Sequence, residues 1–195
     1  MTTCFEQNCE ALASRSAATA AAVRAAGPDS AFGVMTAASG EPVVERNGRA
    51  LDGRRSPSDE ARRQAATITA DRVVVAGFGS GYFVEALLER GIEVTAVIEA
   101  DAACLAAAMR ARDFDRLFRA VPIVLLDALR DVVELATWRA TAPALAVHPP
   151  CVAASADLAA LVAAWPAMRV AKRRPRVLVV GPIYGGSLDV ARLPT

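Results

Sequence analysis

Three glycines at alternate positions form the part of this sequence best suited to bind a ligand. Gly77, Gly79 and Gly81 directly follow the apolar run 73–76, and an amphipathic segment begins at Tyr82. Strand, tight turn and helix in this order bring backbone N–H groups together where they favour polar or anionic ligand groups. Glycine suits such a turn because it allows positive φ and close approach of the backbone to a ligand. We therefore expect a small nucleotide-like ligand at this turn.

A carboxylate follows at the spacing expected for ribose recognition. The next apolar run, 94–98, ends at Glu99, twenty positions after Gly79. An acidic side chain about 20 residues after a glycine turn accepts hydrogen bonds from ribose hydroxyls in dinucleotide-binding folds. The residues predicted here to bind a cofactor are Gly77, Phe78, Gly79, Gly81 and Glu99.

The order of residues in the turn distinguishes between cofactors. Tyr82 stands where a dinucleotide-binding GxGxxG pattern has its third glycine, so only GxGxG is present. With a carboxylate ending the second strand, this pattern resembles the first two motifs of S-adenosylmethionine-dependent methyltransferases, although Ala76 replaces their usual acidic residue. The resemblance implies glycines around the methionine part, Glu99 on the ribose and Asp127 near the adenine. An ordinary helix N-cap is the alternative role for Asp127.

His148 is the one candidate for a catalytic residue. It opens the run His148-Pro149-Pro150-Cys151 after the predicted strand 143–147. Amino-methylating enzymes have Asp or Asn, two prolines and an aromatic residue at this place, so only the prolines match. A histidine can act as a base near neutral pH. A structural role is the alternative, because the motif offers no second titratable partner.

Composition excludes several classes of function. The chain has 195 residues, 54% of them hydrophobic, and a formal net charge of +1, so it can bury a core and has no basic excess for nucleic acid. Its apolar runs are shorter than the roughly 18 residues of a membrane span, and its N-terminus lacks signal-peptide features. Four scattered cysteines and one histidine give no metal-ligand spacing. We expect a cytoplasmic protein with reduced thiols and no metal.

Alternating strand and helix patterns after residue 71 predict an α/β fold. Strands are expected over 73–76, 94–98, 121–126, 143–147 and 176–180. Helices are expected between them over 82–90, 102–112, 128–138 and 156–165. This alternation predicts a Rossmann-like, doubly wound sheet, of methyltransferase type as the motifs imply. Ligands of such sheets lie outside the carboxyl ends of the strands.

The first 70 residues predict a small helical and β-hairpin module. A helix pattern ends at Gly27-Pro28, Asn47-Gly48 is a preferred type I′ hairpin dipeptide, and Ser56 supplies a capping hydroxyl. The expected elements are a helix over 5–26, strands over 32–37 and 42–46, and a helix over 57–69. We divide the chain into this module (1–70), a Rossmann-like domain (71–170) and a basic linker with a final strand (171–195).

A wider resemblance covers roughly residues 39–187. It rests on the stretches Ser39-Gly40-Glu41-Pro42, Asn47-Gly48-Arg49, 75–88, Ile98-Glu99-Ala100-Asp101 and Ala111-Arg112-Asp113-Phe114. Together they resemble the amino-terminal half of bacterial glycosyltransferase-type proteins, which include the motility-accessory-factor proteins and relatives of the spore-maturation glycosyltransferases. The resemblance implies a methyltransferase-like domain that precedes a separate sugar-transfer domain.

The last residues fit two interpretations. The basic run 172–176 reads as a solvated linker, and 177–187 looks like a new strand with a glycine turn. In the resembling proteins such a segment opens the glycosyltransferase domain, of which this chain would hold a truncated start. Alternatively, the strand completes the first sheet.

Three functions remain open from the sequence. The favoured one is a nucleotide-related ligand-binding or scaffold domain of a bacterial glycosyltransferase-associated protein, catalytically incomplete alone. Its candidate ligands are S-adenosylmethionine or a nucleotide, and its expected partner is a downstream glycosyltransferase domain. The alternatives are an S-adenosylmethionine-dependent methyltransferase and a non-catalytic protein-interaction module, which a crevice filled by side chains would favour. The sequence does not indicate an oligomeric state.

Overall fold

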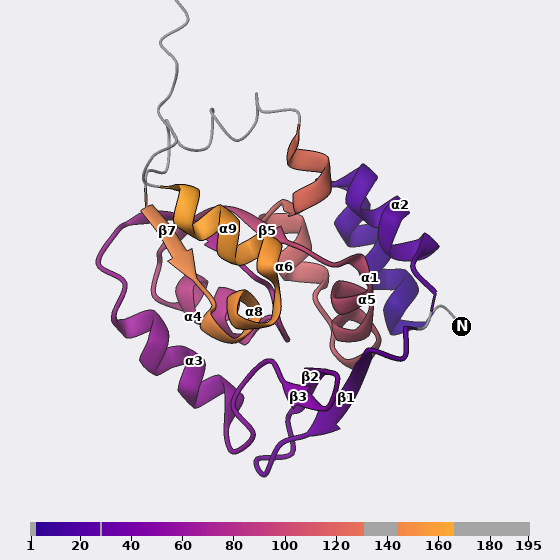
Figure 1. The fold of residues 1–195 in the computed structure, drawn as a ribbon, viewed down its shortest axis with the longest axis horizontal. Helices are drawn as coiled ribbons and strands as arrows, with labels where there is room; N and C mark the ends of the chain where they lie inside the picture. The colour runs from indigo at the N-terminus through magenta and orange to yellow at the C-terminus, as the bar shows by residue number, and fades with distance from the viewer. Residues whose placement is uncertain (1–2, 28, 131–143, 166–195) are drawn as a thin grey trace, which may run out of the picture.

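A four-stranded parallel sheet forms the centre of the computed structural model, which describes residues 3–27, 29–130 and 144–165 (Figure 1). Its strands lie in the order β6-β5-β4-β7 and are flanked by helices. They are β4 (Arg72–Ala76), β5 (Glu93–Glu99), β6 (Ile123–Leu125) and β7 (Ala144–Val147). β4, the first of these four strands along the chain, thus lies inside the sheet, with later strands on both sides of it. This α/β arrangement is compatible with a Rossmann-like fold.

Burial on both faces explains why the sequence of β4 is an unbroken apolar run. Val73, Val74 and Val75 are fully buried, as a strand covered on both faces of a parallel sheet requires. β4 pairs with β5 on one side and with β7 on the other. The carboxyl ends of these three strands therefore meet at one edge, where a ligand site is expected.

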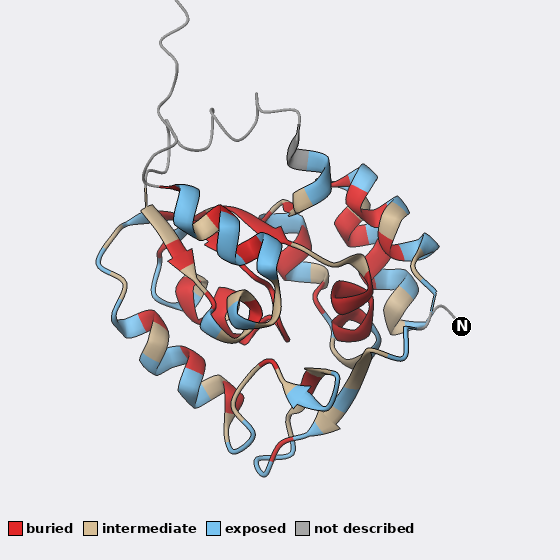
Figure 2. Ribbon diagram, viewed as in Figure 1, coloured by how far each residue is buried: buried red, intermediate tan, exposed pale blue. Residues whose placement is uncertain are grey.

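The helices of the described residues pack against one another in several groups. They are α1 (Cys4–Ala13), α2 (Ala17–Ala25), α3 (Pro57–Ala66), α4 (Tyr82–Glu89), α5 (Ala102–Ala111), α6 (Asp115–Ala120), η1 (Leu126–Arg130), α8 (Pro149–Ala154) and α9 (Ala156–Ala164). α3 packs against α4, while α1 and α2 pack against α5. Figure 2 shows α5 buried along most of its length. Its alanines allow this, because small side chains let several elements approach one helix closely.

A second, antiparallel sheet lies at one end of the molecule (Figure 1). It consists of β1 (Phe32–Thr36), β2 (Pro42–Arg46) and β3 (Arg49–Ala50), in that order. Asn47 and Gly48 connect β2 to β3 with φ of 51° and 74°, the positive values of a type I′ turn. The predicted hairpin dipeptide thus forms a hairpin.

Several predicted helix boundaries and caps were wrong. The helix expected over 5–26 is divided into α1 and α2 because Ser16 turns inward and accepts a hydrogen bond from the N–H of Ile123 at 3.0 Å. Ser56 does not cap the backbone of α3, since its hydroxyl donates to Asp59 at 2.8 Å. The short helices α6 and α8 were not predicted, because six residues carry too little periodicity.

Other sequence predictions lie partly or wholly outside the described residues. These are most of the helix at 128–138, the strand at 176–180 and the basic run 172–176. The division into domains stays a prediction. Within the described ranges, no helix is long and apolar enough to cross a bilayer.

A buried asparagine attaches the N-terminal helices to the rest of the fold. The Asn8 amide on α1 donates to the carbonyls of Met109 and Arg112 at 2.8 and 2.7 Å, and its oxygen accepts the N–H of Phe114 at 2.7 Å. Asn8 is fully buried. It therefore satisfies backbone groups at the end of α5, which a helix terminus leaves without intrahelical partners.

Replacing Asn8 by alanine should lower the free energy of unfolding by about 2 to 4 kcal/mol, because buried backbone groups lose their partners. Denaturant unfolding followed by circular dichroism measures the loss. The exposed neighbour Gln7→Ala is the control and should change stability little. Equal stabilities of the two variants would contradict this structural role of Asn8.

Candidate functional site

The glycine turn lies between β4 and α4 with the backbone geometry that its sequence predicts. Gly77, Gly79 and Gly81 have φ of 92°, 57° and 85°, the left-handed region in which other residues are strained. The turn follows β4, which lies between β5, the next strand of the sheet along the chain, and β7, so the strand order changes direction at this point. In open α/β sheets this is the usual position of a ligand crevice.

Side chains of the protein occupy the space beside each of these glycines. A Cβ on Gly77 would lie 2.4 Å from the Cβ of Cys151, and a Cβ on Gly81 would lie 2.6 Å from the Phe114 ring. At Gly79 a Cβ would meet His148 Cε1 at 2.8 Å and an Asp52 oxygen at 3.0 Å. The absent side chains thus make room for protein atoms.

The N–H groups of the turn are also bonded within the chain. Gly77 donates to the carbonyl of Ile98 at 2.8 Å, and Gly81 donates to the carbonyl of Phe78 at 3.0 Å. Phe78 donates to Glu99 Oε2, and Ser80 donates to Asp52 Oδ2, both at 2.8 Å. These two carboxyl groups take the positions that an anionic ligand could hold at such a turn.

Glu99 binds the turn rather than an open crevice. Its side chain is 3% exposed, and Oε1 accepts the N–H groups of Ala100 and Asp101 at 2.8 and 3.3 Å. Burial raises the pKa of this carboxyl, and the backbone donors, Phe78 first, oppose the shift. The parallel pairing of β4 with β5 places Glu99 beside the turn, so its predicted proximity to the glycines is found.

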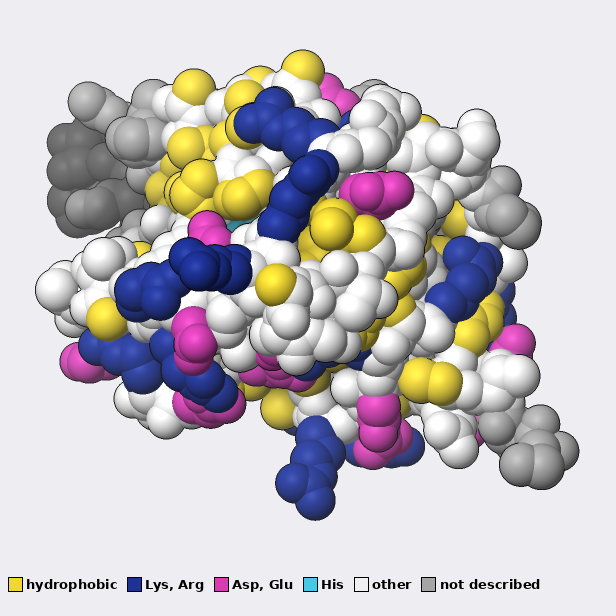
Figure 3. Space-filling view, turned by 90° about the horizontal axis from the view of Figure 1, so that it is seen from below, with side chains coloured by type: hydrophobic (Ala, Val, Ile, Leu, Met, Phe, Trp, Pro, Cys, Tyr) yellow, Lys and Arg dark blue, Asp and Glu magenta, His cyan; other side chains and the backbone are white. Residues whose placement is uncertain are grey.

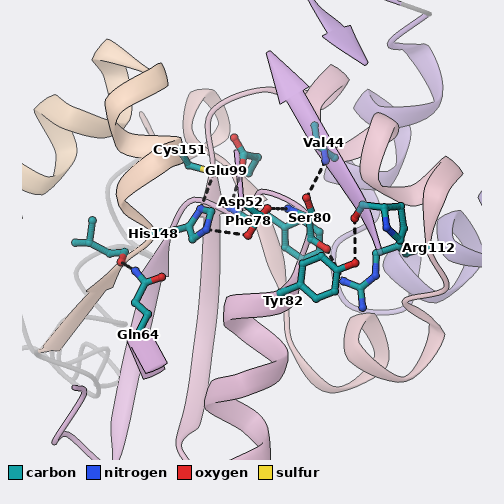
Figure 4. A network of polar contacts seen from close by, with 12 residues as sticks. Val44, Asp52, Gln64, Phe78, Ser80, Tyr82, Glu99, Arg112, His148 and Cys151 are labelled. Carbon is teal, nitrogen blue, oxygen red and sulfur yellow. Dashed lines mark hydrogen bonds and ion pairs between the residues drawn. The ribbon is translucent and has the colours of Figure 1, made fainter. Parts of the chain in front are cut away.

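His148 forms a buried chain of polar contacts with Asp52, from a distant loop, and with Cys151, on the helix α8 that follows it (Figure 4). Its Nε2 lies 3.1 Å from Asp52 Oδ1, and its Nδ1 lies 3.0 Å from Cys151 Sγ. Because a carboxylate can only accept, the simplest neutral arrangement has Nε2–H donating to Asp52 and the thiol donating to Nδ1. His148 and the Asp52 side chain are 3% and 4% exposed.

The thiol, imidazole and carboxylate have the order of a nucleophile, its base and an orienting group. Burial nevertheless raises the pKa of Cys151 well above the usual thiol value, with the nearby Glu99 charge as the second cause. A protonated, enclosed thiol is a poor nucleophile. The sequence offered no signal for Asp52, which comes from a loop far from either motif.

Asp52 belongs to a segment that covers the crevice, which we call the strap (residues 42–52). The N–H of Val44 donates to the Ser80 hydroxyl, and the Tyr82 hydroxyl donates to the carbonyl of Pro42, both at 2.9 Å. Arg46 Nη1 donates to the carbonyl of Ala154 at 2.7 Å. The strap is thus bonded to the glycine turn, to α4 and to α8. Figure 3 views this end of the molecule, where arginine and acidic side chains lie close together.

Little space remains beneath the strap. A cavity of about 10 Å³ lies there, lined by residues that include Leu51, Glu99, Cys104 and Cys151. Such a volume holds about one water molecule. The crevice beside Glu99 therefore has no room for a nucleotide or for S-adenosylmethionine in this conformation.

Asp127 lies in a different pocket. It is exposed on η1 and lines a space of about 530 Å³ between α2 and the carboxyl ends of β5 and β6. Asp101 and Thr19 are the other polar residues that line it. The structure thus brings together the glycine turn, Glu99 and His148, but Asp127 lines another space. Among the described residues, no group of three or more His, Cys, Asp and Glu side chains could hold a metal ion.

Comparisons of the chain with protein-family models, with curated proteins and with solved structures found no match.

The close contacts at Gly79 predict a stability effect beyond its positive φ. Gly79→Ala should destabilise the protein by about 1 to 3 kcal/mol more than Gly40→Ala, because its Cβ overpacks against His148 and Asp52. Gly40 is a matched control, with φ of 88° and no atom within 4 Å of an added Cβ. Denaturant unfolding of both variants measures the difference. Equal losses of stability in the two variants would mean that His148 and Asp52 move aside, and would contradict the predicted overpacking.

The raised pKa of Glu99 predicts a pH dependence of stability. A carboxyl whose pKa is higher in the folded than in the unfolded state contributes stability below the unfolded value, and loses it as pH rises through the folded value. Wild type should therefore lose stability relative to Glu99→Gln as pH rises from about 4, the ordinary carboxyl pKa. Unfolding of both proteins at several pH values gives this difference. Wild type that instead gains stability relative to Glu99→Gln as pH rises would show that the backbone donors outweigh burial.

Proposed function

We propose that this chain is a scaffold domain: a Rossmann-like domain of methyltransferase type whose ligand crevice is filled by its own strap. We further propose that it serves a glycosyltransferase-associated protein, in which it supports a separate sugar-transfer domain. The filled crevice also favours the alternative of a non-catalytic protein-interaction module. The observation that carries the first proposal is the Asp52 carboxylate, which accepts the N–H of Ser80 at 2.8 Å inside the crevice. The second proposal is supported by the sequence resemblance over residues 39–187.

The energetics support a permanent role for the strap. A ligand at the glycine turn would have to displace Asp52 from Ser80 and from His148. Hydrogen bonds to charged groups contribute about 1.5 to 3 kcal/mol each, and their partners would be left buried. The ligand would also expose Leu51, which is 2% exposed. Displacement of the strap would thus make the free energy of ligand binding less favourable by several kcal/mol.

Methyl transfer has less support than a scaffold role. His148 contacts Asp52 and Cys151 through its two ring nitrogens, so neither nitrogen is available to a substrate. Cys151 occupies the position of the aromatic residue that would stack on an acceptor, and it packs against Gly77. The residues that would orient an acceptor are thus replaced by residues that close the site.

A nucleotide-related ligand is the second candidate, and the pocket beside Asp127 favours it. Its volume of about 530 Å³ falls in the usual range for small-molecule sites. Asp101 and Asp127 could accept hydrogen bonds from a base or a ribose, and small alanines of α2 and α5 leave room for a ring. In this alternative, ligand binds outside the strap and Glu99 remains structural.

A ligand screen distinguishes these functions. Thermal shift and calorimetry should show no response of the wild-type chain to S-adenosylmethionine, its demethylated product, ATP or nucleotide sugars. A response that Glu99→Gln abolishes and Asp127→Asn leaves unchanged would show that the crevice opens, which overturns the scaffold proposal. A response that Asp127→Asn abolishes and Glu99→Gln leaves unchanged would establish the second candidate, a nucleotide-related ligand in the pocket beside Asp127. The proposed association is tested separately by the genomic reading frame beyond Thr195, where we expect a sugar-transfer domain.

A further inference from the structure

The outer edge of β1 is an open hydrogen-bonding edge. β1 is the first strand of the order β1-β2-β3, and among the described residues it pairs only with β2. In Figure 1 it lies at the rim of the small sheet. An unpaired strand edge presents N–H and C=O groups that can pair with another extended chain.

The register of the hairpin shows which groups face this edge. Val34 lies opposite Val44, whose N–H bonds to Ser80 and whose carbonyl bonds to the N–H of Leu51. Because Val44 directs both groups away from β1, Val34 and Val44 form a pair without mutual hydrogen bonds. The N–H and C=O of Val34 therefore point away from β2, toward the open edge. Thr36, two residues further on, points the same way.

β1 lacks the features that normally protect an edge. Its sequence, Phe-Gly-Val-Met-Thr, has no charged residue and no proline, and its pairing with β2 shows no bulge. Val34 is 46% exposed and is the one exposed large hydrophobic side chain among the described residues. Apolar exposure thus coincides with unpaired backbone groups on the same residue.

We propose that β1 pairs with β1 of a second copy of this chain, antiparallel and centred on Val34, to form a closed dimer. Around this centre Val34 faces Val34 of the other copy, and each Val34 N–H can donate to the opposite carbonyl. The N–H of Thr36 can donate to the carbonyl of Phe32, whose own N–H already bonds to Asp29 at 3.0 Å. No like charges meet because the strand has none, and each Val34 covers the other. Both copies use the same surface, as a two-fold dimer requires.

Sedimentation and light scattering of the full chain, from micromolar to near-millimolar concentration, test this proposal. Wild type should form a reversible dimer, and Val34→Lys should weaken it at least tenfold, because two ammonium groups would face each other. Ala160→Lys, at an exposed position of α9, is the matched control and should dimerise like wild type. Circular dichroism checks that both variants fold.

A second measurement does not depend on Val34→Lys folding. Val34→Cys should form a covalent dimer under mild oxidation, since directly opposite residues of an antiparallel pair lie within disulfide reach. Wild type and Ala160→Cys are the controls and should not form one. Monomeric wild type at every concentration would overturn the proposal. So would open-ended assemblies, or a dimer that survives Val34→Lys while Val34→Cys does not cross-link.

Discussion

The carboxylate of Asp52 is the interaction on which the arrangement of this site depends. One of its oxygens accepts the N–H of Ser80 at 2.8 Å, and the other lies 3.1 Å from Nε2 of His148. It thereby joins the loop after β4 to the loop after β7, at the point where the strand order changes direction. Without it, a helix start and an imidazole would remain in an apolar interior. The strap thus satisfies polar groups while it excludes solvent, which is what a bound ligand would otherwise do.

Burial of Glu99 illustrates the cost of this closure and how the fold compensates it. Removal of a carboxyl group from water is unfavourable, and burial accordingly raises its pKa. Backbone N–H groups of Phe78, Ala100 and Asp101 compensate in part by donating to its two oxygens. Glu99 therefore fixes the glycine turn relative to β5. The same residue type at the same spacing binds a ribose only when the crevice above it is open.

Sequence patterns were informative wherever local chemistry determines structure. The apolar runs of β4 and β5, the type I′ turn at Asn47-Gly48 and the positive φ of the glycine turn all follow from residue type. The division of α1 from α2 could not be predicted, because it depends on a hydrogen bond between Ser16 and a strand more than a hundred residues away. Asp52 was missed for the same reason. Its role arises from tertiary contacts that leave no periodic signal, and it occupies the site that the glycine motif indicated.

A glycine motif therefore has two physical meanings that sequence alone does not separate. Absence of a Cβ permits close approach of a ligand, and it equally permits close approach of a buried side chain. At Gly77 the approaching atom is the Cβ of Cys151, and at Gly81 it is the ring of Phe114. Either use makes a larger residue unfavourable at the same positions, so both lead to the same GxGxG pattern. What distinguishes them in this structure is the strap, which places its own carboxylate, Asp52, and an apolar cover, Leu51, at the turn.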